Sequence, residues 1–126
     1  VARAALESMA YQVRDVFDVM GAEAGTPPAT LLADGGASRN DLLMQLQADV
    51  LGCPVERSRS SEVSPLGAAF LAGLAVGLWA GEDEIAARVP PRDRFEPQRT
   101  EAERAAAYAR WQEALARTLY EPGSNR

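Results

Sequence analysis

The sequence predicts an α/β fold built on a strand–helix–strand unit. A short apolar run at residues 30–33 ends just before two adjacent glycines, and such uninterrupted runs are typical of strands buried on both faces of a parallel sheet. Helical spacing of apolar residues follows over residues 38–51, and CPVERS at residues 53–58 indicates a second strand. A strand, a helix and a strand within about 30 residues form the βαβ pattern, whose crossover is almost always right-handed.

An amphipathic helix is expected ahead of this unit, over residues 2–20. Apolar side chains that share one face of it are Leu6, Met9, Ala10, Val13, Phe17 and Met20. Gly21, Gly25 and the Pro27-Pro28 pair then end the helix.

The helix of the βαβ unit carries signals at both of its ends. Ser38, with Asp41 three residues later, matches a capping box, and Gly52 is a candidate C-cap. The side chains expected to point inward are those of Leu42, Leu43, Leu46 and Val50. Cys53 is interpreted as a small residue at the start of the second strand.

An uncharged segment from Ser64 to Gly81 predicts a buried helix with Ser64 as its cap and Pro65 in its first turn. The segment is shorter than the ~20 residues of a membrane span and contains several glycines. Gly73 and Gly77 have the GxxxG spacing, which also lets helices of non-membrane proteins pack closely. A buried helix is therefore preferred to a membrane helix.

The remainder of the chain predicts a polar connector and a last helix. Residues 82–99 are interpreted as irregular, with Ala87–Val89 and Asp93–Phe95 as alternative strands. A helix is expected over Thr100–Leu119, followed by a frayed tail at residues 121–126. Two convincing strands are fewer than the 4 to 6 or so that a sheet usually has, so the chain is interpreted as the C-terminal part of a longer one.

Composition excludes several classes of function. The 126 residues suit one domain, and 13 basic against 18 acidic residues give a net charge of −5 without a basic cluster, which argues against a nucleic-acid partner. The absence of histidine and the single cysteine exclude a His/Cys metal site and Ser-His-Asp or Cys-His catalysis within this chain. With one cysteine and no recognisable secretory leader, the cytoplasm is the expected location.

The double glycine, Gly35-Gly36, allows two interpretations. It lacks the Lys-Ser/Thr ending of a Walker A loop and the GxGxxG spacing of a dinucleotide fingerprint, and a turn that needs positive φ would explain it. It also lies at the carboxyl end of a predicted parallel strand and before a helix N-terminus, where α/β sheets bind anionic ligands. Missing Cβ atoms would let a phosphate or ribose approach the main chain, and the Asn40 amide can donate to and accept from a nucleoside.

Other polar and aromatic candidates are better explained structurally. Glu62 is interpreted as a carboxylate near a helix start rather than a general base, and Asp34 as a turn residue. Arg57 and Arg59 are expected at solvent-exposed strand ends rather than facing phosphate. The Tyr108/Trp111 pair is assigned to packing, because its spacing is helical, and not to a nucleobase platform.

Longer segments resemble the C-terminal domain of the FGGY family of carbohydrate kinases. The segments that carry the resemblance are DGGASRNDLLMQLQADVLG, VERS and EVSPLGAAFLAGLAVGLW, and the similarity extends from about Ala5 to Ala116. A strand that ends in two glycines is shared with the actin, Hsp70 and hexokinase group. LLMQLQADVLG and LGAAFLAGLAVG make the chain most similar to the glycerol-type kinases.

The resemblance implies a partial actin-like, ribonuclease-H-like domain, with residues 1–120 as the C-terminal nucleotide-binding lobe of a two-domain kinase. Such a kinase transfers the γ-phosphoryl group of ATP, accompanied by Mg²⁺, to a hydroxyl of glycerol. By resemblance, Gly36 would contact ATP or ADP through its backbone and Asn40 would touch the adenosine portion. Gly35 and Ala37 would shape the turn between them.

The resemblance also implies which parts of the enzyme lie outside this chain. The glycerol-binding residues and the catalytic carboxylate belong to the amino-terminal domain of the family, so no catalytic residue and no metal ligand is assigned here. The chain alone is expected to be inactive, and the whole enzyme to be a cytoplasmic homo-oligomer without a membrane segment. Two alternatives stay open: the same lobe of a xylulose, ribulose or gluconate kinase, and a non-catalytic oligomerisation module.

Overall fold

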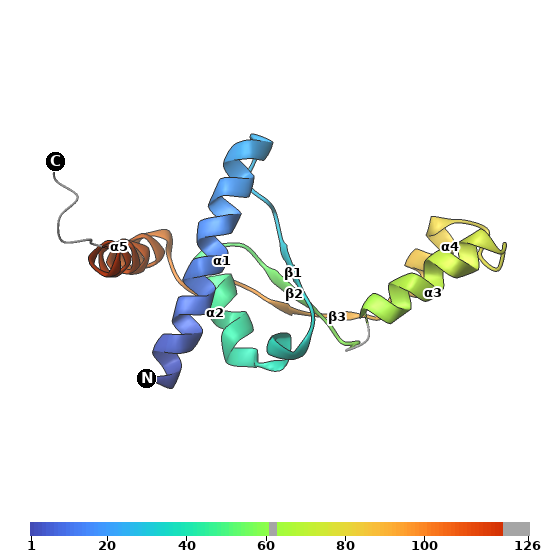
Figure 1. Cartoon of the computed structure of the whole chain (residues 1–126), viewed down its shortest axis with the longest axis horizontal. Coiled ribbons are helices and arrows are strands. Elements are labelled where there is room, and N and C mark those ends of the chain that lie inside the picture. The colour runs from blue at the N-terminus through green and yellow to red at the C-terminus, as the bar shows by residue number, and fades with distance from the viewer. Residues whose placement is uncertain (61–62, 120–126) are drawn as a thin grey trace.

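The computed structural model describes residues 1–60 and 63–119. Its elements, in chain order, are α1 (Ala2–Ala24), β1 (Leu31–Ala33), the 3₁₀ helix η1 (Gly36–Arg39), α2 (Asp41–Leu51), β2 (Val55–Ser58), α3 (Val63–Ala75), α4 (Glu82–Ala86), β3 (Arg92–Phe95) and α5 (Glu101–Thr118). Figure 1 shows α1 and α2 beside a small central sheet, α5 at one end, and α3 with α4 as an arm that projects from the other end. Glu62 and the predicted frayed tail lie outside the described residues.

The described sheet has three strands in the order β1-β2-β3. β1 and β2 are parallel, with Leu31 opposite Val55, which confirms the predicted βαβ unit. β3 is antiparallel to β2, with Phe95 opposite Val55. The alternative strand at Asp93–Phe95 is therefore confirmed as part of β3, whereas residues 87–89 form no strand. The interpretation of residues 82–99 as irregular is wrong at α4 and at β3.

One face of this sheet is covered by helix α2 and the other face is open among the described residues. Leu31 and Ala33 of β1 pack on the core, but Leu32 between them is 60% exposed, so the prediction that both faces of this strand are buried is wrong. On the open face, Glu56 pairs with Arg92 at 3.2 Å and with Arg94 at 2.7 Å. These guanidinium contacts lower the pKa of the Glu56 carboxyl from its ordinary value.

The core lies between α2, α1 and the covered face of the sheet. A first cluster joins α2 to the strands: Leu43, Met44, Ala48 and Val55, with Leu6, Leu31, Ala33 and Phe95 packed around it. A second joins α2 to α1: Ala10, Leu46 and Val50, with Leu6 and Tyr11 beside it. Leu42 is half exposed, so its predicted inward position is wrong, and Met9 and Met20 of α1 are half exposed as well. One residue before Leu43, Leu42 is rotated by about 100° around the helix, away from the buried face.

Helix α2 is capped by a different residue from the one predicted. Asn40 is the N-cap, and its Oδ1 accepts a hydrogen bond from the backbone N–H of Leu43 at 3.1 Å. Ser38 instead lies in η1, where its hydroxyl donates to the carbonyl of Gly35, so the predicted Ser38–Asp41 capping box is wrong. The predicted C-cap Gly52 is confirmed, with φ of 74°.

The arm differs from the predicted buried helix. α3 ends at Ala75 because Gly77 has φ of 73° and its N–H donates to Leu74, while the N–H of Leu78 donates to Gly73, the pattern of a Schellman motif. Gly73 is the buried residue of α3, and a Cβ there would clash with the indole of Trp79. The rest of α3 is largely exposed, so the prediction of a buried helix is wrong. Within residues 1–60 and 63–119, no helix combines the length and hydropathy that crossing a bilayer requires.

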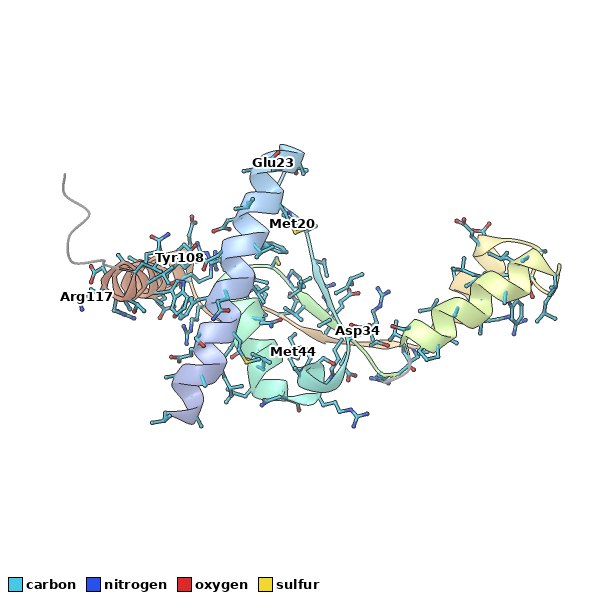
Figure 2. All side chains as sticks on the ribbon, viewed as in Figure 1. Met20, Glu23, Asp34, Met44, Tyr108 and Arg117 are labelled. Atoms are coloured by element: carbon cyan, nitrogen blue, oxygen red, sulfur yellow. The ribbon has the colours of Figure 1, made fainter. Side chains whose placement is uncertain are left out.

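Helix α5 docks on α1 through aromatic side chains. Asp15 of α1 accepts hydrogen bonds from the Tyr108 hydroxyl at 2.5 Å and from the Trp111 indole at 3.2 Å. Tyr11 stacks on Trp111 with ring centroids 5.5 Å apart, and the Arg14 guanidinium lies 4.0 Å from the centroid of the Tyr108 ring. Figure 2 shows Tyr108 at the α1 side of α5. The predicted packing role of this aromatic pair is confirmed.

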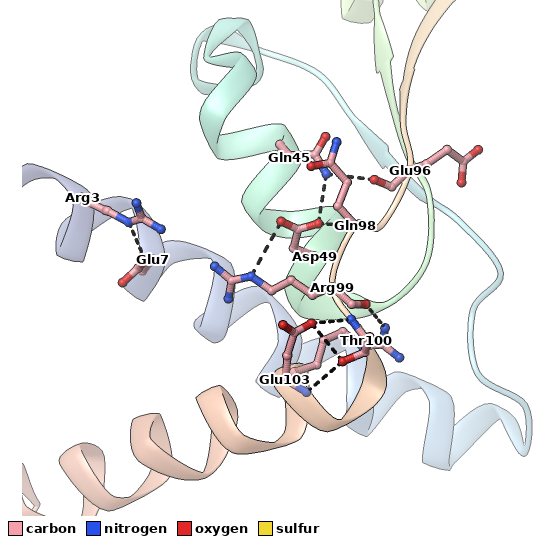
Figure 3. A network of polar contacts seen from close by, with 10 residues as sticks. Arg3, Glu7, Gln45, Asp49, Glu96, Gln98, Arg99, Thr100 and Glu103 are labelled. Carbon is pink, nitrogen blue, oxygen red and sulfur yellow. Dashed lines mark hydrogen bonds and ion pairs between the residues drawn. The ribbon is translucent and has the colours of Figure 1, made fainter.

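A buried carboxylate joins α2 to the segment between β3 and α5. Figure 3 shows Asp49 accepting from the Gln45 amide at 3.0 Å and from the backbone N–H of Gln98 at 2.8 Å, with Arg99 at 3.8 Å. The capping box of α5 follows at once, formed by Thr100 and Glu103. Asp49 therefore fixes where the chain leaves the sheet to begin its last helix.

Candidate functional site

The two glycines at the carboxyl end of β1 have different structural requirements. Gly35 has φ of +81° and ψ of −176°, a backbone region that is essentially restricted to glycine. Gly36 does not have a positive φ, and a Cβ built on it meets no described heavy atom within 4 Å. The turn explains Gly35 but not Gly36. Among the described residues, what the missing Cβ of Gly36 provides is open space beside the main chain.

The turn after the glycines is held by its own hydrogen bonds. The carbonyl of Gly35 accepts from the Ser38 backbone N–H at 3.2 Å and from the Ser38 hydroxyl at 2.8 Å. The carbonyl of Ala37 accepts from the N–H of Asn40 at 3.2 Å. Ser38 is buried while Gly36 and Ala37 are exposed, so the turn presents these two residues to solvent on a fixed frame.

Asn40 has its amide orientation set by the helix cap. Because Oδ1 accepts from the N–H of Leu43, the NH₂ group is the end of the amide that is left for a ligand. The sequence predicted an amide that both donates and accepts, and the structure favours donation. Asn40 therefore lies four residues after Gly36 with a fixed role in the helix start, and its NH₂ group has no hydrogen bond described within residues 1–60 and 63–119.

Arg57 is a residue of the candidate site that the sequence interpretation placed elsewhere. Its side chain is 16% exposed, so its predicted position at a solvent-exposed strand end is wrong, whereas Arg59 is 58% exposed as expected. The guanidinium Nη1 donates to the carbonyl of Ser38 at 3.0 Å and to the carboxylate of Asp41 at 2.6 Å. Nη2 donates to Asp93 at 2.9 Å. The signal lay in the pairing of strands, because Arg57 stands opposite Asp93 in the β2–β3 register.

The charges of this cluster reinforce one another. Hydrogen bonds with Asp93 and Asp41 raise the pKa of the Arg57 guanidinium above its ordinary value. Hydrogen bonds from Arg57 and Arg59 lower the pKa of the Asp93 carboxyl. The hydrogen bonds that lower the pKa of Asp93 stabilise the folded state. This stabilisation is complete at pH values above the pKa of an aspartate in the unfolded chain, and it is lost as the pH falls through the lower pKa of Asp93 in the folded protein.

An open depression of about 410 Å³ lies against this cluster. Residues that line it include Gly35, Ser38, Asp41, Arg57, Arg59 and Asp93. Figure 2 shows Asp34, the residue before the glycines, at the end of β1 that faces the arm. The site thus combines a glycine turn, a helix start and two arginines that share Asp93. It lies at the carboxyl edge of the parallel strands, where α/β proteins bind ligands.

Replacing Gly35 with alanine is expected to lower the free energy of unfolding by about 1–3 kcal/mol, because alanine is strained at this φ and ψ. The measurement is a denaturant titration of the full-length gene product. Gly36→Ala is the matched control and should lie within about 0.5 kcal/mol of the parent, because its Cβ meets open space. Equal losses in the two variants would contradict the assignment of the strain to Gly35.

Comparison with known proteins identifies the family. The model of the C-terminal domain of the FGGY family of carbohydrate kinases matches residues 1–76. The chain therefore belongs to this family, and the predicted resemblance is confirmed. Its relatives include the glycerol kinase of Solidesulfovibrio magneticus, which is 55% identical over 118 residues that cover 94% of this chain and 24% of that protein. This chain thus spans about a quarter of the length of the curated relatives it matches.

Solved structures confirm the predicted fold class, a partial actin-like α/β domain. A Plasmodium falciparum glycerol kinase crystallised with ADP matches with a TM-score of 0.90 at 31% identity, over 97% of this chain and 24% of that one. A xylulose kinase from Rhodospirillum rubrum matches with a TM-score of 0.71, also at 31% identity, over 93% of this chain and 24% of that one. Both comparisons cover nearly the whole of the present chain.

Proposed function

We propose that this chain is the nucleotide-binding lobe, residues 1–120, of a glycerol kinase-like enzyme that transfers the γ-phosphoryl group of ATP to a hydroxyl of glycerol. The observation that carries the proposal is the open main chain at Gly36, at the carboxyl end of a parallel strand and followed by the N-terminus of α2. A nucleotide phosphate or ribose can approach this backbone closely, and the helix N-terminus favours an anion. The similar glycerol kinase from Plasmodium was crystallised with ADP, which supports the same ligand class.

Each residue of the loop has a separate role in this proposal. Gly35 turns the chain, Gly36 contacts the nucleotide through its backbone, and Ala37 presents a small side chain beside it. Asn40 donates from its NH₂ group to the adenosine portion while its oxygen caps α2. These residues bind and orient the nucleotide. The acceptor hydroxyl and the group that receives its proton belong to the other domain of the enzyme, because phosphoryl transfer requires positioning and charge stabilisation from both sides.

Mg²⁺ enters this proposal with the nucleotide and not as a ligand of this chain. In the part of the chain that the structure describes, no three His, Cys, Asp or Glu side chains gather in a way that could hold a metal ion. Mg²⁺ in such enzymes commonly keeps several waters and is held by substrate phosphates with one or two carboxylates. The proposal assigns no residue of this chain to the ion, and no step is derived through it.

Glycerol is preferred to a sugar as the acceptor. The curated relatives with 51–55% identity are glycerol kinases. The similar glycerol kinase structure has a TM-score of 0.90, against 0.71 for the xylulose kinase at equal identity. We further propose that the full-length enzyme is a cytoplasmic homo-oligomer and that residues 1–126 alone have no activity.

The experiment that tests the function uses the full-length gene product. ATP-dependent release of ADP is measured against glycerol, xylulose, ribulose, gluconate and erythritol, together with a titration of ADP. Turnover confined to glycerol is the expected result. Turnover confined to a sugar would keep the family and replace the substrate. Failure to bind ADP would refute the nucleotide site and favour an oligomerisation module, which light scattering on the same sample would detect.

A further inference from the structure

A single guanidinium connects the glycine turn to the sheet. Arg57 of β2 reaches the turn through Nη1, which donates to the Ser38 carbonyl at 3.0 Å and to the Asp41 carboxylate at 2.6 Å. These two acceptors lie on either side of residues 39–40, so the guanidinium holds the chain both before and after Asn40. Through Nη2 the same group donates to Asp93 of the neighbouring strand at 2.9 Å. Arg57 thereby joins η1, the start of α2 and β3.

The guanidinium is itself held in place from the sheet side. Asp93 stands directly opposite Arg57 in the β2–β3 register, and it also accepts from Arg59 at 2.6 Å. The Phe95 ring lies on the same side, with its centroid 5.1 Å from Cζ of Arg57. Because the guanidinium is planar and its donors form a rigid fork, bonds in several directions fix its orientation as well as its position. The position of the turn relative to the sheet is therefore fixed through a rigid group.

Arg59 is a natural comparison for Arg57. Arg57 lies in β2 and Arg59 directly follows it, and both donate to Asp93. Arg59 is mostly exposed, and none of the hydrogen bonds described for its side chain reaches the glycine turn or α2. Arg57 is more buried than Arg59 and also contacts the Phe95 ring, and of the two it alone has a described link to Ser38 and Asp41. Changes in the turn that follow from substitution of Arg57 but not of Arg59 are attributed to that link.

We propose that Arg57 is a positioning residue for the nucleotide: it sets the place of the Gly36 backbone and the Asn40 amide relative to the sheet. This inference rests on the proposed nucleotide-binding function. Arg57 acts through the turn, since its bonds go to the Ser38 carbonyl and the Asp41 carboxylate. Loss of the guanidinium leaves the local bonds of η1 intact and frees the turn to shift as a unit. A displacement of about 1 Å in a binding group can cost up to ~100-fold in activity.

The test compares Arg57→Met with Arg59→Met in the full-length gene product. Three quantities are measured: the Kd of ADP by calorimetry, KM and kcat for ATP, and hydrogen exchange in peptides that cover residues 35–43. Arg57→Met is expected to raise the Kd of ADP and the KM for ATP by ~10-fold or more, with a smaller change in kcat, and to speed exchange in these peptides. Arg59→Met, at a residue that also lines the depression, is expected to change each quantity several-fold less than Arg57→Met, because its guanidinium has no described bond to the glycine turn.

Arg57→Lys serves as the conservative variant and keeps the proposal testable if Arg57→Met does not fold. A lysine retains the positive charge beside Asp93 but lacks the fork that bonds the turn, through Nη1, and Asp93, through Nη2, at the same time. Its Kd for ADP is expected to lie between those of the parent and Arg57→Met, and above that of Arg59→Lys. Equal effects at positions 57 and 59 on both ADP binding and exchange would overturn the inference. A parent protein that binds no ADP would overturn the proposed function itself.

Discussion

Replacing Gly36 with valine is expected to raise the KM for ATP of the full-length enzyme by ~10- to 100-fold, with the protein still folded. The backbone at this position is not in the left-handed region, and a Cβ meets no described atom within 4 Å, so the valine is accommodated. Its two methyl groups would fill the space through which we propose that the nucleotide reaches the main chain. Steady-state kinetics with varied ATP at saturating glycerol, and a thermal melt, measure the two parts of the prediction.

The control for this substitution is Gly36→Ala, whose single methyl group should produce a smaller rise in KM. Together with Gly35→Ala, it separates the two glycines: substitution at 35 should act on stability, and substitution at 36 on the nucleotide. Normal ATP kinetics in a well-folded Gly36→Val enzyme would count against a nucleotide at this backbone. The comparison uses the ratio of kcat/KM values, which reports loss of transition-state binding.

Replacing Asp49 with alanine is expected to give the largest loss of stability among the polar residues, about 2–3 kcal/mol. The carboxylate is buried and accepts from the Gln98 N–H and the Gln45 amide, with Arg99 nearby (Figure 3). Its removal leaves a part-buried backbone donor without an acceptor and loosens the entry to α5. A denaturant titration measures the total loss, and hydrogen exchange over residues 96–104 should report the local opening.

Glu96→Ala is the matched control for Asp49. The Glu96 carboxylate is 62% exposed and pairs with Arg94 on the surface, so its loss should cost less than about 1 kcal/mol. Asp49→Asn keeps one oxygen acceptor for the Gln98 N–H and should fall between the parent and the alanine variant. If Asp49→Ala were no more destabilising than Glu96→Ala, the Asp49 network would not be what holds the segment between β3 and α5.

Patterns that depend on neighbouring residues made much of the fold predictable. Leu31 and Ala33 of the apolar run, the helical spacing after residue 38 and Val55 of β2 all express contacts with the core around α2. β3 was kept only as an alternative because its sequence, RDRF, is dominated by charge. It is held by Arg94 on Glu56 and by Asp93 on Arg57, which are pairings between segments more than 30 residues apart. A single sequence carries no local signal for such pairs.

The candidate site shows the same division between local and distant causes. A glycine turn and a following helix could be recognised from neighbouring residues, and the structure places Gly35, Gly36, Ala37 and Asn40 together at the end of β1. Their contact with a nucleotide stays a prediction. The cap at Asn40 was missed because Ser38 offered an equally good local motif, and only the intervening 3₁₀ turn decides between them. The role of Arg57 needed the register of β2 and β3.

The arm leaves the sheet and returns to it at one place, because Ser58 at the end of β2 stands opposite Arg92 at the start of β3. Residues 59–91 are thus an excursion whose two ends are already tied together by strand pairing. The entropy of closing such an excursion grows only with the logarithm of its length, by about 0.6 kcal/mol for each doubling. Evolution can therefore lengthen, shorten or reshape this part of the molecule with little effect on the pairing that positions Arg57, so the arm and the proposed nucleotide site are free to diverge at different rates.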